Sequence, residues 1–267
     1  NERFIEKLKA IGITEPTAVQ KKVMPLVAQG KNLMFQSETG TGKTFAYLLP
    51  LLQKLESSKN ENKAVRLLIA SPTYELASQI KSQIKAVSDL KCTLCIGGSP
   101  IARQIESLKE KPDIVIGGPA RLLELIHLKK LKANFVETLI LDEADRLLSK
   151  ELRQETENLM ERLPEKVQLI GNSATVSEYT QKVLEKARMQ SAKENSPLKD
   201  SISPIEFITL PAEDVLRKRI THIAIFSERR DKIDTLRSFI NAVKPEKLLI
   251  FTSKSDQIQN ITSSEEL

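Results

Sequence analysis

The sequence predicts an α/β fold, built on a mostly parallel sheet with helices on both faces. Short apolar runs alternate with longer segments of helical periodicity. The runs are apolar throughout, which is typical of strands buried on both faces. The chain of 267 residues is also 40% apolar and 28% charged, an ordinary composition for a globular protein with a substantial core.

Two helices are expected before the first strand. Glu2–Ile11 and Thr17–Ala28 have helical periodicity, and Gly12 and Pro16 separate them as a helix stop and a restart. The next apolar runs predict strands at Asn32–Gln36, Val65–Ala70, Thr93–Ile96, Asp113–Ile116, Thr138–Leu141 and Val167–Gly171. The segments between them predict helices at Phe45–Leu55, Leu76–Ser88, Pro100–Lys109, Arg121–Leu128 and Glu151–Arg162.

A polar stretch predicts a boundary between two domains. Residues 192–200 lack periodicity and contain a proline, which indicates a linker. We therefore expect a first domain over residues 1–191, a linker over 192–203 and a second domain over 204–267. The second domain is expected to be incomplete, because it holds few elements for a stable core. Its expected elements are a strand at Arg219–Phe226, a helix at Asp231–Ala242 and a strand at Lys247–Thr252.

Charge and composition exclude some classes of protein. The net charge is +6, a mild basic excess that is compatible with a polyanionic partner but does not require one. No apolar run reaches 18 residues and no leader opens the chain, so we expect an intracellular protein with no membrane partner. Cys92 and Cys95 lie inside a strand-like run without a second cysteine pair, which favours a packing role over a metal site.

The segment after the first strand carries a phosphate-binding pattern. At such a strand-to-helix junction, backbone N–H groups close around phosphate oxygens. Lys43 can reach the terminal phosphates, and the Thr44 hydroxyl can bind Mg²⁺. Ser37 stands where the strict pattern has glycine; a glycine-rich turn without a ligand is the alternative. The expected nucleotide-binding residues of this loop are Ser37, Glu38, Thr39, Gly40, Thr41, Gly42, Lys43 and Thr44.

Acidic residues follow the apolar strand that ends at Leu141. Carboxylates at the carboxyl end of a parallel strand face the same crevice as the phosphate loop. Asp142 is expected to hold Mg²⁺, and Glu143 is expected to orient or deprotonate the attacking water in an in-line phosphoryl transfer. With Lys43 they form the expected catalytic set. The alternative is an acidic helix start, since carboxylates suit the positive end of a helix dipole.

These two motifs and several others resemble those of DEAD-box ATP-dependent RNA helicases. The motifs occur in that family's order, at Gly12–Gln20, Ser37–Thr44, Pro72–Ala77, Gly97-Gly98, Pro119–Arg121, Asp142–Asp145 and Ser173–Thr175. Leu249–Thr252 resembles the first motif of the family's second RecA-like domain. The resemblance implies a RecA-like P-loop domain over residues 1–191, followed by the beginning of a second RecA-like domain.

The resemblance also implies roles for single residues. Gln20 corresponds to the residue that reads the adenine edge, although an exposed helix glutamine is the alternative. Ser173 and Thr175, with Asp145 as partner, correspond to the motif that couples hydrolysis to strand separation. The RNA-binding positions implied are Pro72, Thr73, Gly98 and Arg121. Contacts of this kind read the RNA backbone, so binding largely independent of RNA sequence is expected.

Two positions depart from the family pattern on the RNA side. Tyr74 stands where the family usually has arginine, and Gly118 stands where it usually has threonine. The loss of one cation and one hydroxyl is expected to weaken RNA binding or its salt dependence. Tyr74 stacking on a base is an alternative to its packing beside its own helix.

The function implied is ATP-dependent, local separation of RNA strands, with ATP and Mg²⁺ as cofactors and RNA as partner. The 267 residues alone are expected to bind nucleotide and RNA weakly, without efficient unwinding, because the second domain normally supplies arginines to the transferring phosphate. One alternative is an ATP-gated RNA-binding clamp or scaffold. Another is a P-loop ATPase that acts on DNA or on protein.

Overall fold

The computed structural model describes residues 2–38, 40–191, 203–210, 221, 223–228 and 230–252. The chain divides into two compact units, Asn1–Ala212 and Glu213–Leu267. The strands are β1 (Asn32–Gln36), β2 (Leu67–Ala70), β3 (Cys92–Cys95), β4 (Ile114–Gly117), β5 (Thr138–Leu141), β6 (Gln168–Ser173) and β7 (Ile205–Thr209). The helices of the first unit are α1 (Glu2–Ala10), α2 (Ala18–Ala28), α3 (Lys43–Ser57), α4 (Tyr74–Val87), α5 (Ile101–Lys109), α6 (Pro119–His127), α7 (Ala144–Leu147), α8 (Arg153–Glu161) and α9 (Glu178–Ser191), with a 3₁₀ turn at Ala133–Phe135.

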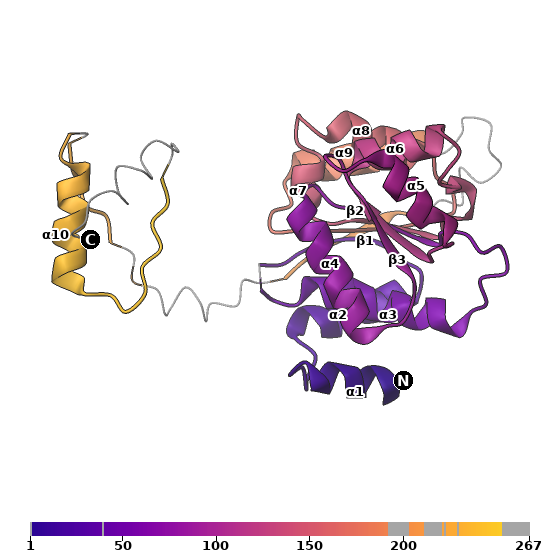
Figure 1. Ribbon diagram of the computed structural model, residues 1–267, viewed down its shortest axis with the longest axis horizontal. Coiled ribbons are helices and arrows are strands. Elements are labelled where there is room, and N and C mark those ends of the chain that lie inside the picture. Colours follow the sequence, from indigo (N-terminus) through magenta and orange to yellow (C-terminus); the bar gives the residue numbers. More distant parts are fainter. Residues whose placement is uncertain are drawn as a thin grey trace. The chain divides into compact units, whose positions relative to one another are not determined.

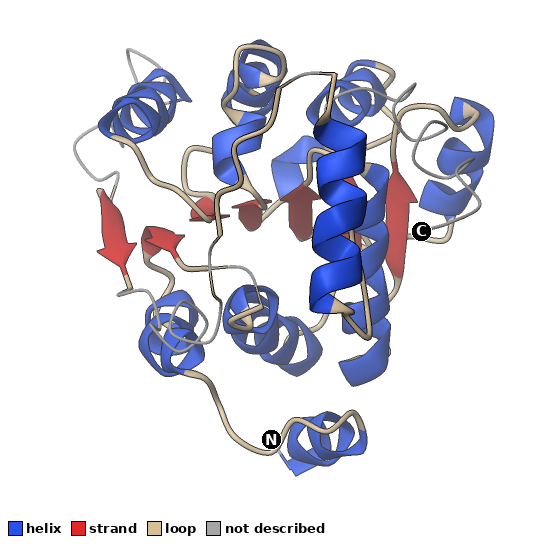
Figure 2. Cartoon of the chain, turned by 90° about the vertical axis from the view of Figure 1, so that its left-hand side faces the viewer, coloured by secondary structure: helices blue, strands red, loops and turns tan. Residues whose placement is uncertain are grey.

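The first unit is a seven-stranded sheet in the order β3-β4-β2-β5-β6-β1-β7, and all of its strand pairs are parallel. Helices cover both faces (Figures 1 and 2). One core layer joins the sheet to α1–α4, and the other joins it to α6–α9, with α5 packed at its margin. The predicted fold class and all six predicted strands of the first domain are therefore confirmed, with boundaries shifted by a few residues.

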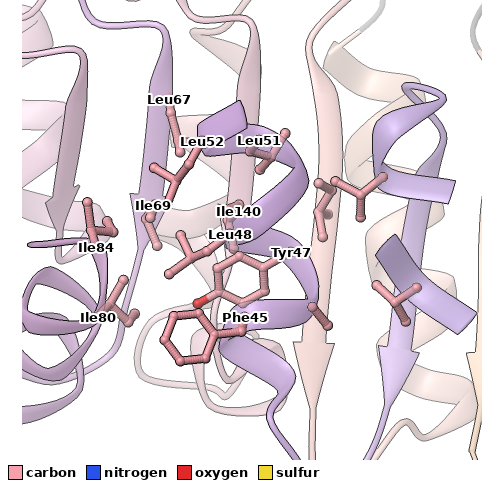
Figure 3. Packing of buried hydrophobic residues seen from close by; sticks show 14 of the residues in the cluster. Phe45, Tyr47, Leu48, Leu51, Leu52, Leu67, Ile69, Ile80, Ile84 and Ile140 are labelled. Carbon is pink, nitrogen blue, oxygen red and sulfur yellow. The ribbon is translucent and has the colours of Figure 1, made fainter. Parts of the chain in front are cut away.

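The core explains why the central strands are apolar throughout. Along β2, for example, Leu67 and Ile69 face the layer beneath α3 and α4, whereas Leu68 faces the opposite layer. Figure 3 shows the first of these layers, with α3 side chains packed against the strands. Side chains alternate between the two faces of a strand, so a strand with helices on both sides needs apolar residues at every position.

The last strand corrects the predicted domain boundary. β7 pairs with β1, from Asn32 opposite Ile205 to Gln36 opposite Thr209, so residues 205–209 belong to the first sheet. The Asn32 amide donates to the Ser203 carbonyl at 2.8 Å and stabilises the entry to β7. The first unit therefore extends beyond the expected linker at 192–203, to Ala212. Residues 192–202 of that linker lie outside the described part of the chain.

The second unit differs from the prediction in its strands. Helix α10 (Lys232–Val243) confirms the helix expected at Asp231–Ala242. The described residues of the two expected strands, within 219–226 and 247–252, form no strand. Strands are stabilised by hydrogen bonds to a neighbouring strand, and no described residue of this unit provides one. Residues 219, 220 and 222 lie outside the described part.

Both cysteines lie in β3, as predicted. Cys92 is half-buried and Cys95 is buried, and both are free thiols. Burial raises the pKa of each thiol to about 12, so both are protonated at neutral pH and pack as small apolar groups. No helix in the described part of the chain is long and apolar enough to span a bilayer.

Candidate functional site

The phosphate-binding pattern forms the loop between β1 and α3. Gly40 and Gly42 both have positive φ values, 83° and 86°, which glycine adopts without a Cβ clash. Gly42 is the N-cap of α3, so Lys43 is the first residue of that helix. The loop therefore ends where the free N–H groups and the positive end of the α3 dipole favour an anion. Thr39 lies outside the described residues.

Contacts within the loop explain why serine is tolerated at residue 37. Its side chain is buried, and its hydroxyl lies 2.6 Å from the Thr41 hydroxyl. Thr41 also lies 2.8 Å from the Glu38 carbonyl, to which its hydroxyl donates. The Lys43 ammonium donates to the Ser37 carbonyl at 2.7 Å. The departure from the strict pattern thus adds a side-chain contact across the loop and leaves no buried hydroxyl unpaired.

Gln20 connects helix α2 to this loop. Thr17 and Gln20 form a capping box at the start of α2, in which the side-chain oxygen Oε1 of Gln20 accepts from the Thr17 backbone N–H at 3.1 Å. The Gln20 amide donates to the Gly42 carbonyl at 3.1 Å. The φ angle favours glycine at residue 42, and a Cβ there would come within 2.5 Å of the Gln20 amide nitrogen and displace it from the Gly42 carbonyl. Gln20 is buried rather than exposed, and its adenine-reading role stays a prediction.

Asp142 lies at the carboxyl end of β5 and is 7% exposed. Its Oδ1 accepts hydrogen bonds from the Asn172 amide at 2.6 Å and from the Tyr47 hydroxyl at 3.1 Å. Burial raises the pKa of the Asp142 carboxyl, and these two bonds to the charged form oppose that shift. Sequence reasoning did not single out Tyr47 or Asn172. The available signal was Asn172, because the alternation of side chains along β6 places this polar residue in the apolar layer beneath α3.

The next acidic residues make separate contacts. Glu143 has left-handed backbone angles, φ 53° and ψ 57°, and its carboxylate forms an ion pair with Arg146 at 3.0 Å. Asp145 accepts a hydrogen bond from the Thr175 hydroxyl at 2.9 Å. The Thr175 backbone N–H in turn donates to the Ser173 hydroxyl at 3.2 Å. The fold therefore brings together the three residues expected to couple hydrolysis to strand separation.

The loop and the acidic residues share one electrostatic environment. They follow β1, β5 and β6, which are adjacent in the sheet. Burial lowers the pKa of the Lys43 ammonium, and the carboxylates of Asp142, Glu143 and Asp145 oppose that shift. One lysine thus lies among three carboxylates at the carboxyl edge, and a divalent cation would offset the excess negative charge where a phosphate binds.

The residues expected to bind RNA follow β2, β3 and β4 at the same edge of the sheet. Thr73 is the N-cap of α4, its hydroxyl accepting from the Leu76 N–H at 3.3 Å, and half-buried Pro72 precedes it. Gly98 lies in an exposed turn after β3 with a φ of 80°. Arg121, in the first turn of α6, donates to Gln104 at 2.9 Å and to the Ser99 carbonyl at 3.1 Å. These positions are separate from the Lys43 site along the sheet.

Comparison with known proteins gives the family. The model of the DEAD/DEAH box helicase family matches residues 17–183. The chain belongs to this family. The match contains the phosphate loop, the acidic residues after β5 and all the positions expected to bind RNA.

This DEAD-box chain is similar over most of its length to proteins named as ATP-dependent RNA helicases. It is 31% identical over 265 residues to the ATP-dependent RNA helicase CshA of Listeria monocytogenes, covering 98% of this chain and 48% of that protein. It is 36% identical over 234 residues to the probable ATP-dependent RNA helicase YfmL of Bacillus subtilis, covering 86% of this chain and 58% of that protein. The chain therefore spans about half the length of these relatives.

A solved structure supports the fold of this DEAD-box chain. The crystal structure of a hypothetical ATP-dependent RNA helicase from Sulfolobus tokodaii matches with a TM-score of 0.65 and 26% identity, covering 98% of this chain and 72% of that one. The shared arrangement is the RecA-like sheet, whose carboxyl edge carries the Lys43 site and the positions expected to bind RNA.

Proposed function

We propose that this chain is the ATP-binding part of an ATP-dependent RNA helicase, which couples ATP binding and hydrolysis to local separation of RNA strands. The observation that carries the proposal is the convergence of Lys43 and the carboxylates of Asp142, Glu143 and Asp145 at the carboxyl ends of neighbouring strands. A glycine-rich loop at a helix N-terminus beside carboxylates is the arrangement that nucleoside triphosphate chemistry requires.

Each group has a proposed part in that chemistry. The loop N–H groups and the Lys43 ammonium hold the phosphates, with Gln20 at the adenine. The residues fit Mg²⁺, because the Thr44 hydroxyl and the buried Asp142 carboxylate are the oxygen ligands it prefers. The ion would neutralise charge on the phosphate oxygens. Glu143 orients or deprotonates the attacking water, which requires its carboxylate to leave Arg146.

Coupling and RNA binding are proposed for the remaining residues. Thr175 joins the β6 segment directly to Asp145, only two residues after Glu143, so a shift at the nucleotide reaches both segments. Pro72, Thr73 and Gly98 offer a helix N-terminus and a turn to an RNA backbone. Arg121 would add a cation, which requires its guanidinium to leave the Glu124 carboxylate, 2.9 Å away. The residues after Ala212 are proposed to belong to a second RecA-like domain.

The 267 residues alone are proposed to hydrolyse ATP slowly. Of the described residues, Lys43 is the cation that the loop provides, and Arg146 is paired with Glu143. Phosphoryl transfer in such enzymes commonly uses an additional arginine to stabilise the transition state. The test is steady-state ATP hydrolysis with Mg²⁺, with and without single-stranded RNA, beside nucleotide titration and circular dichroism. A folded chain that binds nucleotide with little turnover supports the proposal, whereas a folded chain without nucleotide binding contradicts it.

A second function is favoured by two observations on the RNA side. Tyr74 is 55% exposed at the first residue of α4, and Gly118 brings no hydroxyl to the start of α6. Both replace groups that hold phosphate in the resembling family, which favours an ATP-gated RNA clamp without useful unwinding. A strand-displacement assay on the full-length protein distinguishes the two: ATP-dependent RNA binding without displacement supports the clamp.

A further inference from the structure

Tyr47, Asp142 and Asn172 form a buried polar group, which we call the carboxylate trio. The Asn172 amide and the Tyr47 hydroxyl both donate to the same oxygen, Asp142 Oδ1, at 2.6 and 3.1 Å. Tyr47 and Asn172 are 0% and 1% exposed, so neither side chain contacts solvent appreciably. A phenol and an amide in an apolar layer are costly unless they are paired, and here both are paired to one carboxylate.

The sheet register places two members of the trio side by side. Leu141 lies opposite Gly171, so the next residues, Asp142 and Asn172, are neighbours across the β5–β6 pair. They follow Ile140 and Ile170 by two residues, and these isoleucines belong to the core layer that contains α3. Because side chains alternate along a strand, Asp142 and Asn172 face the same layer.

Helix α3 supplies the third member. Tyr47 is four residues after Lys43, one helical turn further along, and Figure 3 shows its ring among Phe45, Leu48 and Ile140. The Thr44 side chain lies next to the same hydroxyl. Tyr47 is therefore in contact with both residues proposed to bind Mg²⁺.

The pattern of donors has a geometric consequence. Two hydrogen bonds on Oδ1 from different directions fix the rotation of the Asp142 carboxylate about its χ2 bond. No described residue donates a hydrogen bond to Oδ2. Hydrogen bonds to a ligating carboxylate orient it toward its metal, and such partners matter for metal affinity nearly as much as the ligands do.

We propose that Tyr47 and Asn172 are positioning residues that fix the Asp142 carboxylate and leave its Oδ2 for the Mg²⁺ of a bound nucleotide. This inference rests on the proposed function, in which the phosphate loop binds ATP with Mg²⁺. In this inference, two residues of the core orient the Asp142 carboxylate, a task that neither the phosphate loop nor Glu143 and Asp145 perform.

The test measures Mg²⁺ linkage rather than turnover. The dissociation constant of ADP is determined by calorimetry for the 267-residue chain, once with Mg²⁺ and once with EDTA. The readout is the constant in EDTA divided by the constant in Mg²⁺, which we call the Mg²⁺ ratio. Tyr47→Phe and Asn172→Leu keep the side-chain volume and remove one donor each. Each is expected to lower the ratio by roughly tenfold, with the affinity in EDTA unchanged.

Two controls separate positioning from stability. Leu48→Ala alters the neighbouring, fully buried residue on α3; it is expected to lower the melting temperature and leave the Mg²⁺ ratio unchanged. In an Asp142→Asn background, where no carboxylate remains to be positioned, Tyr47→Phe is expected to have no further effect on the ratio.

The outcomes decide the inference. An unchanged ratio in both Tyr47→Phe and Asn172→Leu overturns it, and so does an equal fall of the ratio in Leu48→Ala. In either case nucleotide binding by the unsubstituted chain leaves the proposed function standing. Absence of nucleotide binding by a folded, unsubstituted chain contradicts the proposed function, and this inference with it.

Discussion

The two edges of the sheet treat charged groups in opposite ways. At the amino edge, Arg66 and Asp113 precede β2 and β4 and form a buried ion pair at 2.9 Å. At the carboxyl edge, the direct partners of the two central charges are neutral: Lys43 donates to a carbonyl, and Asp142 accepts from an amide and a phenol. Arg66 and Asp113 neutralise each other and hold the fold together, whereas Lys43 and Asp142, whose direct partners are neutral, can still attract a charged ligand.

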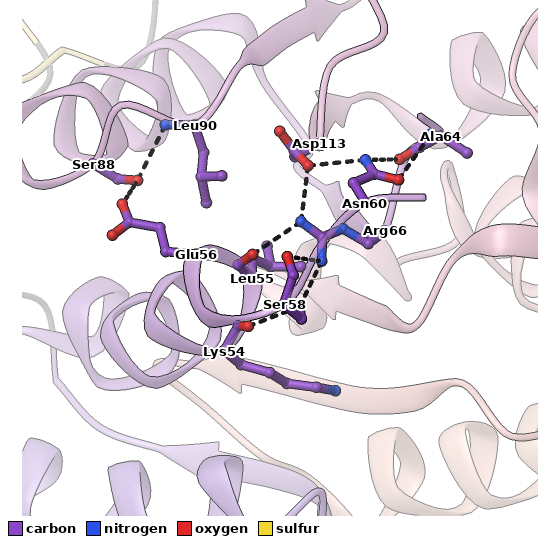
Figure 4. A network of polar contacts seen from close by, with 10 residues as sticks. All are labelled: Lys54, Leu55, Glu56, Ser58, Asn60, Ala64, Arg66, Ser88, Leu90 and Asp113. Carbon is purple, nitrogen blue, oxygen red and sulfur yellow. Dashed lines mark hydrogen bonds and ion pairs between the residues drawn. The ribbon is translucent and has the colours of Figure 1, made fainter. Parts of the chain in front are cut away.

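At the amino edge, a network of hydrogen bonds around Arg66 connects α3 to the strands. Arg66 donates to the Leu55 carbonyl at 3.0 Å and to the Ser58 hydroxyl at 2.7 Å, and the Asn60 amide donates to Asp113 at 2.9 Å (Figure 4). A hollow of about 860 Å³ lies beside this network. The hollow is lined by charges of both signs and lies at the edge opposite the Lys43 site, so its size does not mark it as the functional site.

The largest expected effect is on stability, from Asp113→Ala. This variant leaves the Arg66 guanidinium buried without its counterion, which is expected to cost about 3–5 kcal/mol of unfolding free energy. Urea denaturation followed by circular dichroism measures the loss, and ADP affinity is expected to stay within about twofold because the edges are separate. The double variant Arg66→Met/Asp113→Leu is the control, with a smaller loss expected. A large change in ADP affinity would show that the two edges are coupled.

The next effect is on nucleotide binding, from Lys43→Ala. Removing the ammonium is expected to weaken ADP binding by at least about 100-fold, since the phosphates of the ligand lose their cationic partner on the protein. The melting temperature is expected to change little, because Lys43 contacts the loop and not the core. Lys54→Ala is the matched control on the same helix, where the side chain is exposed and pairs with Glu137. Equal ADP affinity in both variants would remove the phosphate-loop assignment.

A smaller effect is expected on RNA binding, from Arg121→Gln. The guanidinium is expected to contact one phosphate, so its removal should weaken single-stranded RNA binding several-fold and reduce the salt slope by about 0.7. Fluorescence anisotropy at several salt concentrations measures both quantities. The matched control is Arg162→Gln, an exposed arginine near the amino edge, which is expected to leave the slope unchanged. An unchanged slope in Arg121→Gln would place RNA elsewhere.

At neutral pH the smallest effect is that of the two thiols of β3, because it appears only above about pH 9. The unfolded chain loses its thiol protons from about pH 9, whereas burial raises the folded pKa of both cysteines to about 12. The folded state therefore binds more protons between these values, and stability is expected to fall as the pH rises from about 9 to about 12. Urea midpoints across this range measure the fall. The Cys92→Ala/Cys95→Ala variant should show a shallower dependence, and an identical slope would contradict the burial of the thiols.

Much of the fold could be predicted because local signals agreed with it. Apolar runs located β1 to β6, and glycine with proline separated α1 from α2. β7 could not be found in this way, because its pairing partner β1 lies about 170 residues earlier and its own sequence follows a polar stretch. In the second unit, local apolar runs predicted strands that have no neighbour among the described residues.

The sequence predicted the residues of the site that are proposed to contact the ligand directly, but not the residues that position other side chains. Lys43, Asp142 and Glu143 stand in motifs that name their chemistry. Asn172 was hidden because only the pairing of β5 with β6 places its amide against the carboxylate, and Tyr47 was hidden because its contact depends on how α3 packs on the sheet. The Gln20 contact to Gly42 is likewise set by how α2 packs on the loop.

The position of β1 in the sheet has a consequence for biosynthesis. Both of its neighbours, β6 and β7, are made long after it, since β1 ends at Gln36 and β7 ends at Thr209. At a translation rate of about 5–20 residues per second, β7 follows β1 by roughly 10–35 s. During that interval the strand that carries the phosphate loop has no ladder on its β7 side, and for most of it none on its β6 side. The nascent chain therefore acquires an ordered nucleotide site only after almost the whole first unit has left the ribosome.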